Sequence, residues 1–166
     1  HRCHDMVVAL DEIVWAVNPR NDSVNSAISY LSRYAQNFLE PTHVRCRLEI
    51  REAGQDHALN SEQRHNLFLA FKEALNNVAK HSGASEARVK ISCEDGQRLF
   101  VTIEDNGRGL PGSVEAGSDG LDNLRHRMHQ IGGRCEIISL PAGGVAVHLS
   151  LPLAGRKKFN PTQEFQ

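Results

Sequence analysis

The sequence predicts a two-layer α+β sandwich, in which a mixed β-sheet carries its helices on one face. A length of 166 residues is typical of one domain, and 40% hydrophobic with 23% charged residues is the usual globular balance. Segments with helical periodicity are interleaved with strands of two kinds, some joined as hairpins and others joined through a helix. An all-parallel sheet would contain no hairpins, so these observations together favour a mixed sheet.

Two helices are expected at the N-terminal end. Over residues 5–17 the apolar side chains recur near helical spacing, and Asn18-Pro19 then ends the helix. The Asn-Asp-Ser run at residues 21–23 supplies capping residues for a second helix, which should end before Pro41. Both helices are amphipathic and therefore need a partner surface.

The central part of the chain alternates strands with one long helix. Apolar and charged residues alternate over residues 44–50, which indicates a half-buried strand. Ser61 can cap a helix that runs to about Ser82, where Gly83 stops it. Residues 87–93 and 98–104 are strand-like, and the Asp-Gly pair between them indicates a hairpin.

A glycine-rich segment and a second helix-hairpin unit complete the predicted elements. Residues 106–120 are rich in glycine, and a helix is expected from about residue 121 to 131, ended by two glycines. Strands are expected at residues 134–140 and 145–151. The polar tail 154–166 is expected to be disordered.

Composition excludes several classes of function. The formal net charge is −1, so no basic excess favours nucleic acid or an anionic membrane. The apolar runs are far shorter than the roughly 20 residues that cross a bilayer, so no membrane span is expected. The four cysteines form no CxxC pair, which fits a reducing cytoplasm better than a zinc site or a disulfide framework.

The long helix carries the first group of candidate functional residues. Glu73 and Asn77 lie one turn apart, on the side that also carries Asn66 and Lys80. Asn is disfavoured inside a helix, so Asn76 and Asn77 suggest a role beyond helix formation, although a solvated face would look similar. A carboxylate beside an amide oxygen suits a general base together with a hard oxygen ligand for Mg²⁺.

Two glycine-rich segments form the second group. Residues 104–109 (Glu-Asp-Asn-Gly-Arg-Gly) follow a strand, where the plain alternative is a hairpin turn. Residues 107–112 match GxGxxG, but no helix opens directly after them, so we reject a dinucleotide fold; no P-loop motif occurs either. Residues 117–121 (Gly-Ser-Asp-Gly-Leu) precede a helix, whose N-terminus can face a phosphate.

Taken in order, these motifs resemble a known family. Residues 73–81, 105–109 and 117–121, followed by Gly143-Gly144, resemble the N box and the glycine boxes of the GHKL ATPases. Within that superfamily the chain resembles the ATP-binding catalytic domain of a bacterial sensor histidine kinase, over roughly residues 7–153. The stretches 10–19 and 80–83 resemble the subclass that partners helix-turn-helix response regulators. The resemblance implies the Bergerat fold, ATP and Mg²⁺.

The resemblance also implies a role for each matching residue. Glu73 would be the general base or polarising group and Asn77 the Mg²⁺ ligand, while Lys80 would reach the phosphates with His81 near the same end of the nucleotide. Asp105 would accept a hydrogen bond from the adenine amino group, which a guanine carbonyl cannot donate. The remaining cofactor-binding residues would be Gly107 and Gly109, which leave room for the purine, Gly117 and Gly120, the flexible points of a short ATP lid over residues 110–120, and Leu121. One departure is Val145, where the family often has Thr, so a water-mediated contact near adenine would be lost.

The resemblance divides the chain and names its partners. Residues 1–17 would be the end of a dimerisation helix, residues 18–153 the ATP-binding domain and residues 154–166 a tail. The phosphoacceptor histidine would lie on a hairpin outside this segment, so that His4 is not the acceptor. A response regulator would act downstream, and the full-length kinase would be a homodimer with this part in the cytoplasm.

Two other functions remain open from the sequence. One is a GHKL ATPase that hydrolyses ATP to drive a conformational change, as gyrase-like and MutL-like proteins do, although those have a longer lid. The other is a regulatory nucleotide-binding module or a serine kinase of the anti-sigma type. The chemical stability of the phosphorylated residue separates the last from a histidine kinase.

Overall fold

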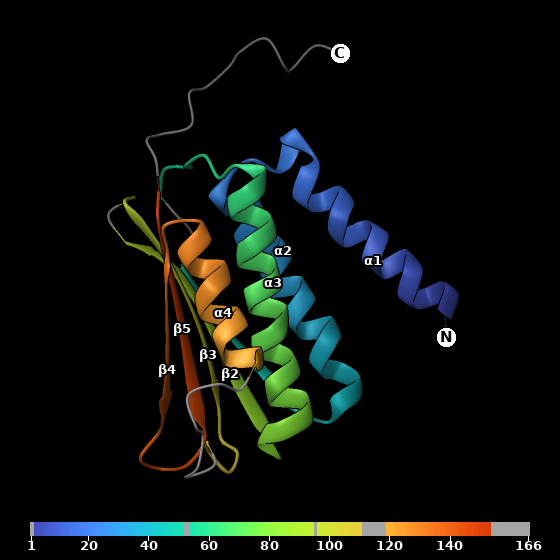
Figure 1. Cartoon of the computed structure of the whole chain (residues 1–166), viewed down its shortest axis with the longest axis vertical. Coiled ribbons are helices and arrows are strands. Elements are labelled where there is room, and N and C mark those ends of the chain that lie inside the picture. Colours follow the sequence, from blue (N-terminus) through green and yellow to red (C-terminus); the bar gives the residue numbers. More distant parts are fainter. Residues whose placement is uncertain (1, 52–53, 95, 111–118, 154–166) are drawn as a thin grey trace.

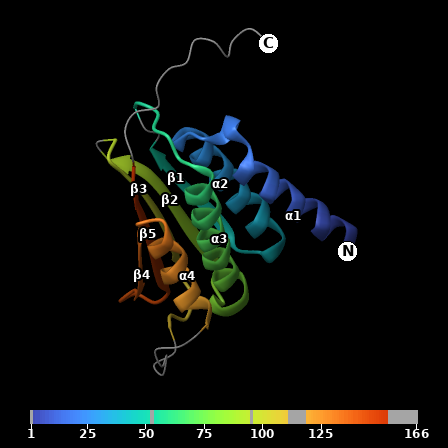
Figure 2. The same cartoon turned by 45° about the horizontal axis from the view of Figure 1, so that its top comes forward.

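The computed structural model describes residues 2–51, 54–94, 96–110 and 119–153, with the backbone alone for residues 2–9 and 119. A five-stranded sheet forms one layer, and helices α2, α3 and α4 cover one of its faces, with α1 outside them (Figures 1 and 2). The helices are α1 (Arg2–Val17), α2 (Val24–Leu39), α3 (Ser61–Asn77) and α4 (Asp119–Gln130). The strands are β1 (Arg45–Arg51), β2 (Glu86–Glu94), β3 (Arg98–Asp105), β4 (Arg134–Ser139) and β5 (Val145–Pro152).

The sheet has the mixed topology that the sequence predicts. Its strand order is β1-β2-β3-β5-β4, with β1 parallel to β2 and the other neighbours antiparallel. The parallel pair is joined through α3, because parallel neighbours need a long crossover. β2 with β3 and β4 with β5 form the two expected hairpins. Asp95, at the turn of the first hairpin, lies outside the described residues.

The helix boundaries follow local capping chemistry, with two corrections. Ser23 caps α2 by accepting a hydrogen bond from Ser26 N at 3.1 Å, as the sequence suggests. Ser61 was the wrong cap for α3: Asn60 accepts from Gln63 N at 2.8 Å, and Gln63 returns the bond to Asn60 N at 3.0 Å. Such a reciprocal pair satisfies two free N–H groups, which Ser61 alone could not do. α4 begins at Asp119, two residues before the predicted start.

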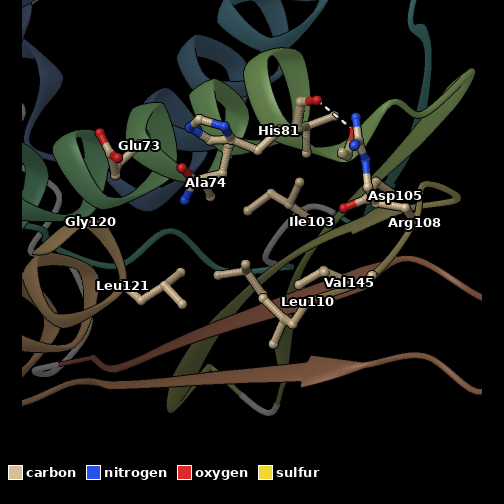
Figure 3. A pocket seen from close by; sticks show the side chains of 15 residues that line it. Glu73, Ala74, His81, Ile103, Asp105, Arg108, Leu110, Gly120, Leu121 and Val145 are labelled. Atoms are coloured by element: carbon tan, nitrogen blue, oxygen red, sulfur yellow. Dashed lines mark hydrogen bonds between the residues drawn. The ribbon is translucent and has the colours of Figure 1, made fainter. Parts of the chain in front are cut away.

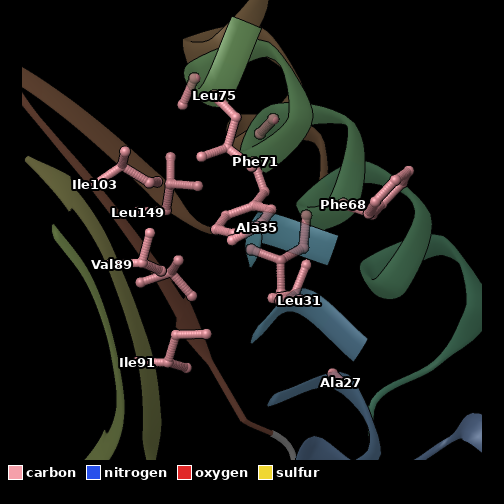
Figure 4. Close-up of a cluster of buried hydrophobic side chains, with 14 of the residues drawn as sticks. Ala27, Leu31, Ala35, Phe68, Phe71, Leu75, Val89, Ile91, Ile103 and Leu149 are labelled. Atoms are coloured by element: carbon pink, nitrogen blue, oxygen red, sulfur yellow. The ribbon is translucent and has the colours of Figure 1, made fainter. Parts of the chain in front are cut away.

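The hydrophobic core lies between the sheet and the inner faces of the helices (Figure 4). Ala27, Leu31 and Ala35 of α2 and Phe71 and Leu75 of α3 are all nearly inaccessible. They face the inward positions of the strands, which include Val89, Ile91, Ile103 and Leu149. The alternating strand pattern and the helical stripes therefore meet in one core.

The end of α1 belongs to this core, whereas its outer face does not. Trp15 and Ala16 are buried, and the Trp15 ring stacks on Tyr30 of α2 with centroids 4.0 Å apart. Leu10, Ile13, Val14 and Val17 on the same helix are more than half exposed. In the described part of the chain, no helix is long and apolar enough to cross a membrane.

Candidate functional site

A cavity of about 530 Å³ opens between the C-terminal half of α3, the start of α4 and the ends of strands β3 and β5 (Figure 3). Its volume is in the range of small-molecule sites. It is lined by Glu73, Ala74, Asn77, Val78, His81, Ser82, Ile103, Asp105, Arg108, Gly109, Leu110, Gly120, Leu121, Val145 and Val147. Eight of the residues singled out from sequence are in this lining: Glu73, Asn77, His81, Asp105, Gly109, Gly120, Leu121 and Val145.

Asp105 carries a carboxylate at an inward position of β3, where the alternation of the strand otherwise has apolar side chains. Leu99, Val101 and Ile103 precede it on the inward face of β3, and each is 1% exposed, against 6% for Asp105. Its Oδ1 accepts a hydrogen bond from Gly107 N at 2.8 Å. Among the described residues no hydrogen bond to Oδ2 is found. Asp105 lines the cavity, so this oxygen is open to a ligand that carries a hydrogen-bond donor.

Apolar side chains form the walls beside Asp105. Ile103 and Val147 project from neighbouring strands onto the helix-facing side of the sheet, and Val145 and Leu110 lie beside them in Figure 3. Flat apolar walls with one buried acceptor at the end fit a planar heterocycle that donates a hydrogen bond. The sequence did not assign Ile103 or Val147 to the site, although the strand alternation does place both on the inward face, whereas Leu110 was expected as the first residue of the lid.

Glu73 lies at the other end of the cavity, against the start of α4. A Cβ atom at Gly120 would stand 3.1 Å from Glu73 Oε1, so the missing side chain lets the carboxylate approach the first helical turn. Gly120 is therefore part of α4 rather than a hinge in a loop. Asn77 follows one turn after Glu73 on α3, and both side chains are half-buried. Their oxygens form the donor set that a hard divalent cation prefers.

The helix that carries these residues changes geometry at the site. After Asn77 the chain continues as a π-helical turn, Val78–Ser82, and ends at Gly83 with φ of 62°. The predicted helix end is thus confirmed, but nothing in the sequence indicated the wider turn, a feature that is frequent at functional sites. His81 projects from this turn over the cavity in Figure 3. Arg108 N donates to Ser82 O at 2.9 Å, which ties the glycine segment to the end of the turn.

Two glycines at the Asp105 end of the cavity allow backbone segments to approach each other closely. A Cβ at Gly107 would lie 2.2 Å from Ser82 O, and one at Gly144, where φ is 97°, would lie 1.8 Å from Asp105 O. No side chain fits at either position. The space at Gly107 therefore accommodates the chain itself, which corrects the expectation that this glycine leaves room for the purine.

Three residues expected near the site are placed differently. Asn66 is buried and donates to Glu62 O at 3.1 Å, away from the cavity, because it turns toward its own helix. Lys80 is exposed, and Gly107 and Lys80 are both outside the cavity lining. Gly117 lies outside the described residues, as does most of the predicted lid.

The residues present fit a magnesium nucleotide. The buried acceptor and apolar walls suit a base with an amino group, and the Glu73–Asn77 pair suits a cation bound to phosphates. Around the described part of the cavity, His81 and Arg108 supply nitrogen donors beside the two carboxylates. Within the described residues, no group of three or more His, Cys, Asp or Glu side chains could hold a metal ion unaided. A cation here would therefore need ligands from the nucleotide.

Two sequence relatives of this chain are named sensor histidine kinases. The sensor histidine kinase LiaS of Bacillus subtilis is 34% identical over 105 residues, covering 63% of this chain and 29% of that protein. The sensor histidine kinase MctS of Rhizobium johnstonii is 32% identical over 138 residues, covering 81% and 29%. The chain thus spans less than a third of the length of these relatives.

Solved structures and a family model complete the comparison. The ATP-binding domain of PrrB from Mycobacterium tuberculosis has a TM-score of 0.64 at 23% identity, covering 80% of this chain and 97% of that one. The blue-light activated histidine kinase of Erythrobacter litoralis EL346 has a TM-score of 0.70 at 22% identity, covering 91% and 54%. Both likenesses show the fold. The family model of the histidine kinase-, DNA gyrase B- and HSP90-like ATPases matches residues 62–155, more than half of the chain. The chain belongs to this ATPase family, with the fold of its histidine kinase branch.

Proposed function

We propose that this chain binds Mg-ATP and transfers the γ-phosphoryl group to a histidine outside residues 1–166, as the catalytic domain of a two-component sensor kinase. The observation that carries the proposal is Asp105, a buried carboxylate with one oxygen left for a ligand, at the apolar end of a cavity whose other end holds Glu73 and Asn77. The relatives that share this sequence pattern are named sensor histidine kinases.

Asp105 would select adenine. Its free oxygen accepts a hydrogen bond from an exocyclic amino group, whereas guanine presents a carbonyl at that position and would leave two acceptors facing each other. A site built to receive a donor rejects an analogue that lacks it, because the buried polar atom is then unpaired. Ile103 and Val147 would pack on the faces of the base.

Glu73 and Asn77 would act at the phosphates. A magnesium ion would neutralise phosphate charge when bound, and the Asn77 amide oxygen would be its ligand from this chain. The acceptor imidazole nitrogen bonds to the γ-phosphorus as the bond to the β–γ bridging oxygen breaks and ADP leaves. The Glu73 carboxylate takes up the imidazole proton. His81 and the exposed Lys80 supply positive charge or donors from the rim; Gly109, Gly120 and Leu121 shape the cavity.

The acceptor would come from the helical hairpin to which α1 belongs. The exposed apolar residues of α1, Leu10, Ile13, Val14 and Val17, form a stripe suited to pairing with other helices, which supports a homodimer through this helix. A response regulator would receive the phosphoryl group afterwards. Because the reaction consumes ATP, this domain would work in the cytoplasm.

The test is phosphoryl transfer from labelled ATP. The chain alone should remain unlabelled and should label a separately supplied hairpin of its parent protein with acid-labile phosphate. Glu73→Gln should slow the transfer at least tenfold while nucleotide affinity stays close to that of the wild type, because the amide keeps the shape of the side chain but cannot accept the proton. Label on His4 of the isolated chain, acid-stable label on serine, or ATP hydrolysis without transfer would each contradict the proposal.

A further inference from the structure

An ion pair joins α1 to the helix that carries the catalytic carboxylate. Lys72 Nζ lies 2.9 Å from Glu12 Oε1 and 2.8 Å from Oε2, so both carboxylate oxygens are engaged. The Glu12 side chain is only 11% exposed and that of Lys72 is 32% exposed. Water competes weakly for a pair that is this far buried, and a charge left without its partner there is costly.

The Glu12 carboxylate lies in surroundings where its charge needs Lys72 as a partner. The Lys72 ammonium lies 6.0 Å from the centre of the Phe68 ring. Burial, and after it the charge of the Glu12 carboxylate, raises the pKa of both Tyr30 and Tyr34, so this charge acts on the aromatic groups of α2. The carboxylate thus lies among aromatic rings at the meeting of three helices, where the medium screens charge less than bulk water does.

Arg64 provides a second tie between the same two helices. It is 1% exposed, and its Nη2 donates to Ala16 O at 2.7 Å and to Asn18 O at 3.3 Å. These carbonyls lie at the C-terminal end of α1. The Arg64 guanidinium therefore also interacts favourably with the negative end of the helix dipole. The two ties lie two turns apart on α3, so α1 is fixed in direction as well as in position.

Lys72 precedes Glu73 in the sequence, and the two side chains leave α3 on different faces. Lys72 faces α1, whereas Glu73 faces the cavity. One rigid helix therefore connects the direction of α1 to the position of the carboxylate. A displacement of about 1 Å in a reacting group can reduce a rate about a hundredfold.

We propose that Glu12 and Lys72 are positioning residues for phosphoryl transfer: their ion pair sets the direction in which α1 leaves the ATP-binding domain, and so holds the acceptor hairpin in line with Glu73. This inference rests on the proposed function, because it requires that α1 continues into the hairpin. The pair does not touch the nucleotide, so it acts on the rate of transfer and not on ATP binding.

The experiment compares two formats of the same reaction. In the parent kinase the hairpin is attached through α1, whereas in the second format the 166-residue chain phosphorylates a separately supplied hairpin. Glu12→Gln should lower kcat for the attached hairpin about tenfold and leave the KM for ATP unchanged. The same substitution should leave the rate on the separate hairpin within twofold of the wild type. An unchanged KM also shows that the variant is folded.

Two further variants complete the design. Exchange of the charges, Glu12→Lys with Lys72→Glu, should restore most of the lost rate, which loss of packing alone would not allow. Glu49→Gln is the matched control, because it breaks an exposed ion pair with Arg88 at 3.3 Å on the sheet, and both formats should then behave as the wild type.

Three results would overturn the inference alone: a wild-type rate for Glu12→Gln in the parent kinase, an equal loss in both formats, or a changed KM for ATP. Absence of transfer by the wild-type protein in both formats would instead overturn the proposed function, and this inference with it.

Discussion

At the scale of single residues, the site separates two tasks along one cavity. Asp105 holds the end where the walls are apolar, and Glu73 with Asn77 holds the end where α4 begins. Each carboxylate is placed by a glycine that lacks the side chain which would displace it, Gly107 for Asp105 and Gly120 for Glu73. We therefore propose different residues for base recognition and for phosphate chemistry, so each can be tested separately.

Asn77→Ala should remove the magnesium dependence of ATP binding. The substitution deletes the amide oxygen that we assign to the ion and keeps a good helix former. ATP affinity measured by calorimetry with and without Mg²⁺ should then be the same, whereas in the wild type magnesium strengthens it. Asn76→Ala is the control, since Asn76 is the neighbouring helix residue outside the cavity lining. A wild-type magnesium response in Asn77→Ala would refute the assignment.

The two tyrosines predict a loss of stability at high pH. Burial, and after it the charge of Glu12, raises the pKa of Tyr30 to about 12 and that of Tyr34 as well. The folded state thus favours the neutral phenols, and their contribution is complete below the unfolded pKa of about 10. The free energy of unfolding should fall as pH rises from about 10 toward 12. Tyr30→Phe should weaken that dependence; a slope equal to that of the wild type in denaturant titrations would contradict the assignment.

Sequence patterns identified the polar residues of the site better than its walls. Alternation along β3 places Asp105 on the inward face, and helical spacing brings Glu73 and Asn77 together. Spacing along α3 wrongly grouped Asn66 with them, because a side chain that bonds to its own helix can turn away from the face that its position suggests. The position of Lys80 outside the lining depends on the π-helical turn, which rotates the residues after Asn77 and has no sequence signal here.

At the scale of elements, the connection between β4 and β5 supports the end of the cavity beside Asp105. Gly144 lies against the carbonyl of Asp105, and Gly143 lies near Gly107 O, with a Cβ there at 3.3 Å. The end of β3 and the β4–β5 turn are therefore packed backbone to backbone. This contact fixes the backbone at Asp105, whose side chain accepts a hydrogen bond from Gly107 N.

Gly144→Ala should reduce both stability and ATP affinity. The new Cβ would stand 1.8 Å from Asp105 O, so the strand end has to move. Gly132→Ala separates this clash from backbone strain: φ is 73° at Gly132, but nothing lies within 4 Å of its Cβ. The control should lose about 1–2 kcal/mol of unfolding free energy, the cost of a left-handed residue, with ATP affinity unchanged. Equal losses in both variants, measured by chemical denaturation and calorimetry, would contradict the packing role of Gly144.

The accuracy of the predicted helix ends depended on capping hydrogen bonds between residues three positions apart. The sequence placed the C-terminal end of α1 and both ends of α2 correctly, because prolines follow the two helices and a serine caps the second. It started α1 at residue 5, three residues late. It missed Asn60, since the reciprocal bond with Gln63 decides between two adjacent cap candidates. The predicted start of α4 was too late, because the glycine-rich run before it gives no helical pattern for the first turn.

At the scale of the whole molecule, one sheet and its helical layer carry both the site and the attachment of α1. The mixed character of the sheet was predictable, because hairpin signals give antiparallel neighbours and a crossover helix gives parallel ones. The strand order, with β5 between β3 and β4, was not predicted. The ties between α1 and α3 were not predictable, since neither Arg64 nor Lys72 carries a sequence pattern that names its partner. Long-range contacts between polar residues emerge only when the layers are assembled.

The central claim is that the cavity beside Asp105 binds ATP through adenine. The measurement that tests it most directly is a calorimetric titration of the 166-residue chain with Mg-ATP and with Mg-GTP, repeated with Asp105→Asn. We expect saturable binding of one ATP per chain, at least tenfold weaker binding of GTP, and a marked loss of ATP affinity in the variant, whose amide replaces one acceptor by a donor. Equal affinities for the two nucleotides, or an unchanged ATP affinity in Asp105→Asn, would contradict it.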